Sequence, residues 1–114
     1  MPYIEAKFSC KLDENKISDL KTAFGKAIEL IPGKSENWLM VNIEDGKNIF
    51  FKGNRDEESA FISVSIFGSA SNSAYSDLTA ELCKVVLEIT GVPASRTYIT
   101  YSEFDKWGWN GSNF

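Results

Sequence analysis

The segment SAFISVSIF (residues 59–67) decides the fold, because it repeats the pattern with which the chain begins. Its apolar side chains occupy every second position, which is the period of a β-strand with one buried face. Residues 2–10, PYIEAKFSC, alternate in the same way. A shift of 58 residues aligns the apolar positions: Ile4 with Ile62, Ala6 with Val64 and Phe8 with Ile66.

The same shift holds for the segment that follows each strand. Residues 12–34 predict a helix that begins after Asp13 as N-cap and stops at Pro32-Gly33, and residues 71–91 predict a second helix. The apolar stripes coincide, as do the two glycines that end them: Leu20 with Leu78, Phe24 with Leu82, Ile28 with Val86, Ile31 with Ile89 and Gly33 with Gly91. Further strands are expected at NWLMVNIE (residues 37–44) and SRTYITYSEF (residues 95–104), where Val41 meets Ile99.

The chain is therefore predicted to be an α+β fold made by internal duplication of a βαβ unit. Right-handed crossovers place both helices on one face of a four-stranded sheet. A turn at Asp45-Gly46 leads into a short extended piece, and residues 52–59 are expected to be a loop between the halves. With 114 residues, the chain is expected to be a single domain, 1–114, with pseudo-repeats 2–58 and 59–114.

Composition excludes several classes of function. A net charge of −4 with scattered lysines argues against nucleic-acid binding, and no apolar run is long enough for a membrane span. The first residues do not have the pattern of a signal peptide, so a cytoplasmic location is expected. Cys10 and Cys83 match no metal or redox spacing and are expected to be buried, reduced thiols. The chain has no histidine, so a general base must come from another group, and no metal site is expected.

Two helices cover only one face of the predicted sheet, whereas Phe61 and Phe67 lie on the other face. The tail DKWGWNGSNF (residues 105–114) adds Trp107, Trp109 and Phe114. This is more aromatic surface than a solvated terminus usually carries, so packing against further subunits is expected.

Four features together resemble the macrophage migration inhibitory factor family of the tautomerase superfamily. They are Pro2, the Gly33-Lys34 pair, RTYITY at residues 96–101 and GWNGSNF at residues 108–114. The resemblance implies a homotrimer whose sheets line an inner barrel, with an active site at each subunit interface. It also implies keto–enol tautomerisation of small aromatic keto acids such as phenylpyruvate, and of dopachrome analogues, with no cofactor.

The resemblance assigns roles position by position. Pro2 matches the catalytic proline, Lys34 the lysine that binds the substrate carboxylate, and Tyr98 a tyrosine from the adjacent subunit. Phe67 stands where the family usually has a smaller aliphatic residue, and Thr100 where the mammalian form has asparagine. Hydrophobic wall positions of the substrate pocket match Tyr3, Trp38, Trp107, Trp109 and Phe114.

Pro2 has two interpretations from its own chemistry. Proline is tolerated at the first position of a strand, so a structural role is sufficient to explain it. Alternatively, removal of Met1 exposes the nitrogen of Pro2 as an α-amino group, a kind of group whose reference pKa is about 7.7–8.0. Burial and a nearby ammonium such as that of Lys34 lower this pKa further, which gives a free base at neutral pH.

A second function of a different class also fits the resemblance. The family includes cytokine-like proteins that leave cells without a signal peptide and act on a receptor. Under that hypothesis the pocket is vestigial, catalysis is weak, and the departures at Phe67 and Thr100 reflect that loss.

Overall fold

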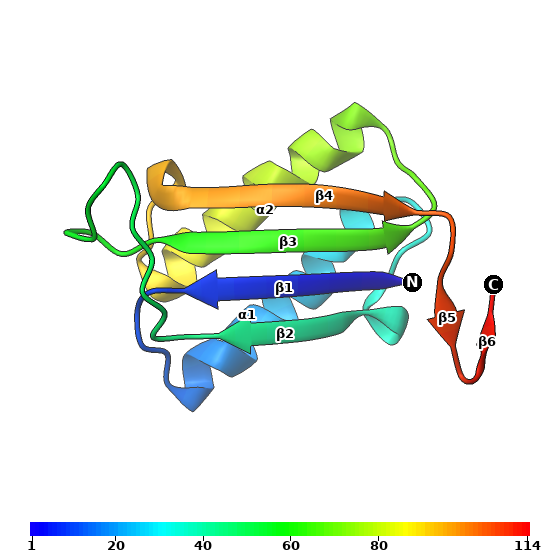
Figure 1. Cartoon of the computed structure of the whole chain (residues 1–114), viewed down its shortest axis with the longest axis horizontal. Coiled ribbons are helices and arrows are strands. Elements are labelled where there is room, and N and C mark those ends of the chain that lie inside the picture. Colours follow the sequence, from blue (N-terminus) through cyan, green and yellow to red (C-terminus); the bar gives the residue numbers. More distant parts are fainter.

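The computed structural model describes all 114 residues (Figure 1). The first half contains β1 (Pro2–Phe8), α1 (Glu14–Ala27) and β2 (Met40–Glu44), and the second contains β3 (Ala60–Phe67), α2 (Asn72–Thr90) and β4 (Thr97–Phe104). Three 3-10 turns, η1 (Ile28–Leu30), η2 (Glu36–Trp38) and η3 (Ala94–Arg96), lie in the connections. Two short strands, β5 (Gly108–Trp109) and β6 (Ser112–Asn113), end the chain.

The sheet has the order β2-β1-β3-β4. Each repeat contributes a parallel pair, and β1 runs antiparallel to β3 where the repeats meet. The strand register follows the shift of 58, because Tyr3 pairs with Met40 in the first repeat and Phe61 with Tyr98 in the second. Both helices cover one face of the sheet (Figure 1), so the predicted fold class is confirmed.

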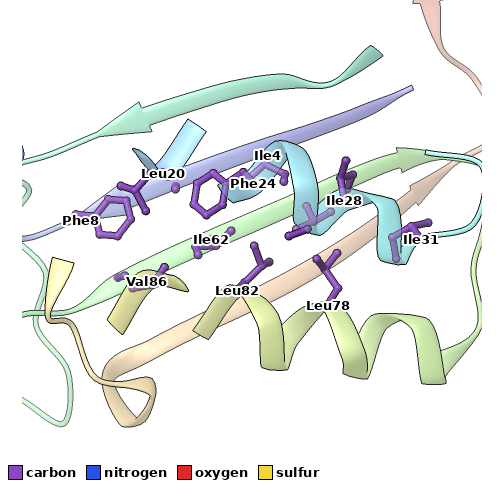
Figure 2. Packing of buried hydrophobic residues seen from close by; sticks show 14 of the residues in the cluster. Ile4, Phe8, Leu20, Phe24, Ile28, Ile31, Ile62, Leu78, Leu82 and Val86 are labelled. Carbon is purple, nitrogen blue, oxygen red and sulfur yellow. The ribbon is translucent and has the colours of Figure 1, made fainter. Parts of the chain in front are cut away.

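The core lies between that face and the two helices (Figure 2). Phe24 of α1 and Leu82 of α2, which are equivalent under the shift, are both fully buried. Burial of a side chain of this size stabilises the fold by about 1.5–3 kcal/mol. Every second residue of β1 and β3 points to the opposite side of the core. These residues are Ile4, Ala6, Phe8, Ile62, Val64 and Ile66.

The helices begin at equivalent residues, and equivalent glycines follow them in the chain. Asp13 Oδ1 accepts a hydrogen bond from the backbone N–H of Lys16 at 2.8 Å, as predicted for an N-cap, and Ser71 Oγ accepts one from Ala74 at 3.1 Å. These bonds satisfy backbone donors that have no partner within the first helical turn. Gly33 and Gly91 have φ values of +82° and +80°, a conformation that glycine adopts without steric cost.

The duplication continues beyond the predicted strands and helices. Phe51 forms an antiparallel bridge with Asn54, and Trp109 pairs with Ser112 at the equivalent place. The two residues inside each turn also share a left-handed backbone, with φ of +53° and +81° at Lys52 and Gly53, and +52° and +86° at Asn110 and Gly111. The sequence predicted a loop at residues 52–59 and no strand in the tail, so both turns add to that prediction.

The starts of two predicted strands were wrong in detail. The predicted strands start too early, because Trp38 and Arg96 lie in 3-10 turns that precede β2 and β4. The helix-free face of the sheet is mixed, since the register places Ser63 and Ser65 between the aromatic residues Phe61 and Phe67 on this face. No helix in the structure has the length and apolar run that a membrane crossing requires.

The two cysteines are both free thiols, but they are partly exposed where full burial was expected. Burial raises the pKa of Cys83, and burial with a smaller contribution from Glu58 raises that of Cys10. Both thiols are therefore poor nucleophiles at neutral pH, because the thiolate is the reactive form.

Candidate functional site

A cleft of about 890 Å³ opens at the end of the sheet where β1 begins. Figure 1 shows the N-terminus at this end, with β5 and β6 beyond it. Pro2 and Tyr3 enter the cleft from β1, and Ser65 enters from β3. The remaining walls come from η2, the start of β2 and the end of the chain, and comprise Trp38, Leu39, Met40, Phe104, Trp107 and Trp109.

Aromatic pairs hold the cleft walls in place. Trp38 and Trp109 meet edge to face, with ring centroids 5.2 Å apart and planes at 88°. Phe114 stacks on Trp109 at 6.3 Å and contacts Phe67 at 5.7 Å. Pairs of this geometry contribute about 0.5–1.5 kcal/mol beyond their buried area. The short hairpin of β5 and β6 is therefore fixed over the end of the sheet by its own side chains.

Pro2 is buried, and Met1 before it is partly exposed. It pairs with Ile66 at the start of β1, a position where its missing N–H costs no ladder hydrogen bond. The carbonyl oxygen of Met1 accepts a hydrogen bond from the backbone N–H of Phe67 at 3.0 Å. The pKa of the Met1 amine is lowered, first by burial and then by the positive charge of Lys34. A free amine at this end of β1 is therefore less readily protonated than usual.

Lys34 approaches the same end of the sheet from the loop after η1. Its Nζ donates a hydrogen bond to the carbonyl oxygen of Phe67 at 2.8 Å. An ammonium group has three donors, so this bond leaves two of them for a ligand. Phe67 and Phe114 lie beside the cleft rather than in its lining, and Phe67 borders a second, shallower hollow of about 500 Å³.

Tyr98 and Thr100 do not reach the cleft of their own chain. Pro2 pairs with Ile66 of β3, whereas Tyr98 pairs with Phe61, five residues away. At about 3.3 Å per residue, Tyr98 lies roughly 16 Å away along the sheet. Tyr98 is 59% exposed, and Thr100 is also exposed. The structure therefore groups Pro2, Tyr3 and the three tryptophans in one cleft, with Lys34 beside it, and leaves these two residues at a distance.

Sequence reasoning missed several residues of the cleft. Ser65 could have been found from its strand parity, since it lies two positions from Phe67. Lys106 stands next to Trp107 in the tail and is the only residue with a charged side chain in the lining. No acidic residue lines the cleft. No group of three or more His, Cys, Asp or Glu side chains is arranged to hold a metal ion.

A duplicated βαβ sheet with a proline starting its first strand, in an aromatic cleft without acidic residues, defines the class of protein. It is the fold of the tautomerase superfamily. Within this superfamily, the chain belongs to the macrophage migration inhibitory factor family, whose model matches residues 1–114.

Comparison with individual proteins agrees with this assignment. The chain is 29% identical over 110 residues to a macrophage migration inhibitory factor homolog of Trichuris trichiura, covering 94% of this chain and 96% of the relative. It is 30% identical to the crystal structure of MIF2 from Leishmania major, with a TM-score of 0.92 over 100% of this chain and 97% of the other. The structure of Pt0534 inactivated by 2-oxo-3-pentynoate is 20% identical, with a TM-score of 0.85 over 96% and 93% of the two chains, a likeness that shows the fold alone.

Proposed function

We propose that this chain is a cofactor-free keto–enol tautomerase for small aromatic 2-keto acids of the phenylpyruvate type. Pro2 acts as the general acid and base after removal of Met1. The observation that carries the proposal is the position of Pro2, which starts β1 in an aromatic cleft without acidic residues. The pKa of the neighbouring Met1 amine is lowered by burial and by Lys34, and the same causes are expected to act on the Pro2 amine.

The proposed reaction moves one proton between two atoms of the substrate. Lys34 binds the substrate carboxylate with the donors that its bond to Phe67 leaves free. The aromatic ring of the substrate lies against the tryptophan walls, which exclude water. The neutral amine of Pro2 removes a proton from the carbon next to the carbonyl group, and the same proline returns a proton to the carbonyl oxygen. The product is the enol, and no atom is gained or lost.

Removal of Met1 is necessary for this mechanism. While Met1 is attached, the nitrogen of Pro2 belongs to an amide and has no basic lone pair. The carbonyl oxygen of Met1 also accepts the hydrogen bond of the backbone N–H of Phe67, which is then not available to a substrate. Loss of Met1 therefore creates the base and frees a backbone donor beside it. This donor is suited to the oxygen on which negative charge develops.

The proposed assembly is a homotrimer of single-domain subunits. Tyr98 and Thr100 serve the cleft of a neighbouring subunit, because neither reaches the cleft of its own chain. The aromatic residues exposed near the far end of the sheet, Phe50, Phe61 and Tyr98, provide apolar surface for this contact. Sedimentation equilibrium should give three times the chain mass of 12.7 kDa.

The central test compares the protein beginning at Pro2 with Pro2→Gly and with a form that retains Met1. Pro2→Gly should lower kcat/KM for phenylpyruvate by about a hundredfold, the usual contribution of a general base. Retention of Met1 should abolish turnover. Intact mass spectrometry defines the first residue of each preparation, and sedimentation confirms that the assembly is unchanged. Undiminished turnover by either form would exclude Pro2 as the base.

An independent test uses 2-oxo-3-pentynoate, the compound that inactivated the distant relative Pt0534. A neutral Pro2 amine should add across its triple bond, so the chain gains the mass of one whole reagent molecule with no leaving group. The label should map to the N-terminal peptide and should be absent when Met1 is retained. The rate of labelling should rise with pH through the lowered pKa of the amine and then level off. Labelling elsewhere in the chain would contradict the assignment.

A further inference from the structure

The charge of the cleft differs from that of the whole chain. The chain carries 16 acidic and 12 basic residues, yet the only charged side chain in the cleft lining belongs to Lys106. Lys34 adds a second cation beside it. A cleft bordered by charges of one sign favours ligands of the opposite sign. This cleft therefore favours anions, although the protein as a whole is acidic.

Lys106 and Lys34 come to the cleft region from different segments of the chain. Lys34 lies in the loop after η1 and is held by the carbonyl of Phe67. Lys106 lies between β4 and β5, directly before Trp107 of the wall. The two ammonium groups are therefore carried by separate segments and are suited to two separate anionic groups of one ligand.

The acidic neighbours of Lys106 do not share its place in the cleft. Glu103 and Asp105 border the second hollow and do not line the cleft, whereas Phe104 lines both. The Nζ of Lys106 lies 3.5 Å from the carboxylate of Asp105, but both side chains are more than four-fifths exposed. Ion pairs between exposed side chains contribute little in water, so the contact with Asp105 does not prevent Lys106 from binding a ligand. Its ammonium group is available to a ligand.

We propose that Lys106 is a second anion-binding residue of the active site. The preferred substrate class is then an aromatic 2-keto acid with a further carboxylate at the end remote from the keto acid. This inference rests on the proposed function for the keto acid at Lys34 and Pro2, and it adds the second contact. A cleft of about 890 Å³ lies near the upper end of the range for small-molecule sites, which leaves room for such a ligand.

The test measures binding rather than turnover. The probes are 3-phenylpropionate and 3-(4-carboxyphenyl)propionate, which have one and two carboxylates and no keto group to tautomerise. All three tryptophans of the chain line the cleft, so their fluorescence reports ligand there. The wild-type protein beginning at Pro2 is compared with Lys106→Gln and Lys106→Glu. Lys84→Gln, an exposed lysine on α2, controls for the loss of one positive charge.

We expect the wild-type protein to bind the dicarboxylate about tenfold more tightly than the monocarboxylate. This ratio should fall to about one in Lys106→Gln and below one in Lys106→Glu, while Lys84→Gln should keep the wild-type ratio. Added salt should reduce the wild-type preference, because the side chain of Lys106 is largely exposed. An equal ratio in wild type and Lys106→Gln, or an equal fall in Lys84→Gln, would overturn the inference.

The binding test of Lys106 and the turnover test of the proposed function can fail independently of each other. Binding of the two probes needs no proton transfer, so a Pro2→Gly protein reports the same preference. If phenylpyruvate is not turned over but the dicarboxylate preference depends on Lys106, the tautomerase proposal fails and the anion site stands. If phenylpyruvate is turned over and the preference is insensitive to Lys106, the anion site fails alone.

Discussion

The two ends of the sheet are equivalent under the shift of 58 residues, but one is open and the other is closed. At the open end, Trp38 and Trp109 stand at the cleft, and Trp38 is 52% exposed. Their equivalents at the closed end are Arg96 and Phe51. Arg96 is only 9% exposed, and its guanidinium lies 5.3 Å from the centre of the Phe51 ring.

Hydrogen bonds explain why the second end closes. Arg96 Nε donates to Ser59 Oγ at 2.9 Å, and another guanidinium nitrogen donates to the carbonyl oxygen of Asn54 at 3.1 Å. The long, planar side chain of arginine thus holds the turn at residues 51–54 against the sheet. Tryptophan has a single N–H donor and cannot form such a bridge. The same backbone arrangement therefore leaves a cleft at one end of the sheet, while at the other end the hydrogen-bonded side chain of Arg96 fills the equivalent space.

The largest effect on stability is expected from breaking the closed end. Arg96→Met should lower the free energy of unfolding by about 3 kcal/mol, because Ser59 and Asn54 lose buried hydrogen-bond partners. Trp38→Met, its equivalent at the open end, should cost about 1 kcal/mol or less, since Trp38 is half exposed. Urea unfolding at neutral pH measures both. Equal losses would show that the two ends do not differ in packing.

The next effect concerns the N-caps, where the halves are expected to behave alike. Asp13→Ala and Ser71→Ala should each lower the free energy of unfolding by about 1 kcal/mol, because each leaves one backbone N–H without its acceptor. Ser71→Asp, which keeps an acceptor, provides the matched control and should retain most of the stability. Thermal unfolding gives the comparison. A large loss at one cap only would mean that one helix supports the fold more than the other.

Smaller changes are expected at the glycines that follow the two helices. Gly33→Ala and Gly91→Ala should each cost about 0.5–1 kcal/mol, because alanine is strained at positive φ but also restricts the unfolded chain. Nothing crowds the added methyl group at either site, so backbone conformation alone sets the cost. The two unfolding midpoints in urea should fall by the same amount. A stabilised variant would show that the backbone conformation at that glycine imposes no strain.

The smallest effect is a pH dependence due to Tyr75, a residue whose equivalent in the first half does not titrate. Burial and the hydrogen bond to Glu103 raise the pKa of Tyr75 from 10.0 to about 12, while its equivalent in the first half is Ile17. Because the folded pKa lies above the ordinary value, the stabilisation is complete below pH 10 and is lost as the pH rises toward 12. The unfolding midpoint should therefore fall more steeply in wild type than in Tyr75→Phe over this range. Parallel curves would refute this contribution.

Much of the fold was predictable because it is encoded by neighbours along the chain. The alternation at residues 59–67, the helical stripe around Phe24 and the cap at Asp13 each depend on positions within a few residues. The repetition of these patterns at a constant shift added a check that single elements lack. The turns at residues 51–54 and 109–112 escaped prediction, although the shift also relates them. Their aromatic and glycine residues do not show the periodicity of a strand or helix.

The candidate site was predictable only in part. The family resemblance pointed to Pro2 and Lys34, and the structure places both at the same end of the sheet. Lys106 was not predicted, because a single lysine next to an acidic residue has the pattern of solvated surface. Tyr98 and Thr100 remain predictions for a neighbouring subunit, since one chain brings neither to the cleft.

The sequence by itself thus determined the duplication, the order of strands and helices, and the side of each element that faces the core. These follow from local periodicity, which any solution of the fold must satisfy. Only the tertiary structure decided which end of the sheet is open and that positively charged side chains border the cleft at that end. Those properties depend on whether Trp38 or Arg96 meets the returning turn, and on the position of Lys106 relative to Pro2. Such contacts join residues far apart in sequence, so no local pattern records them.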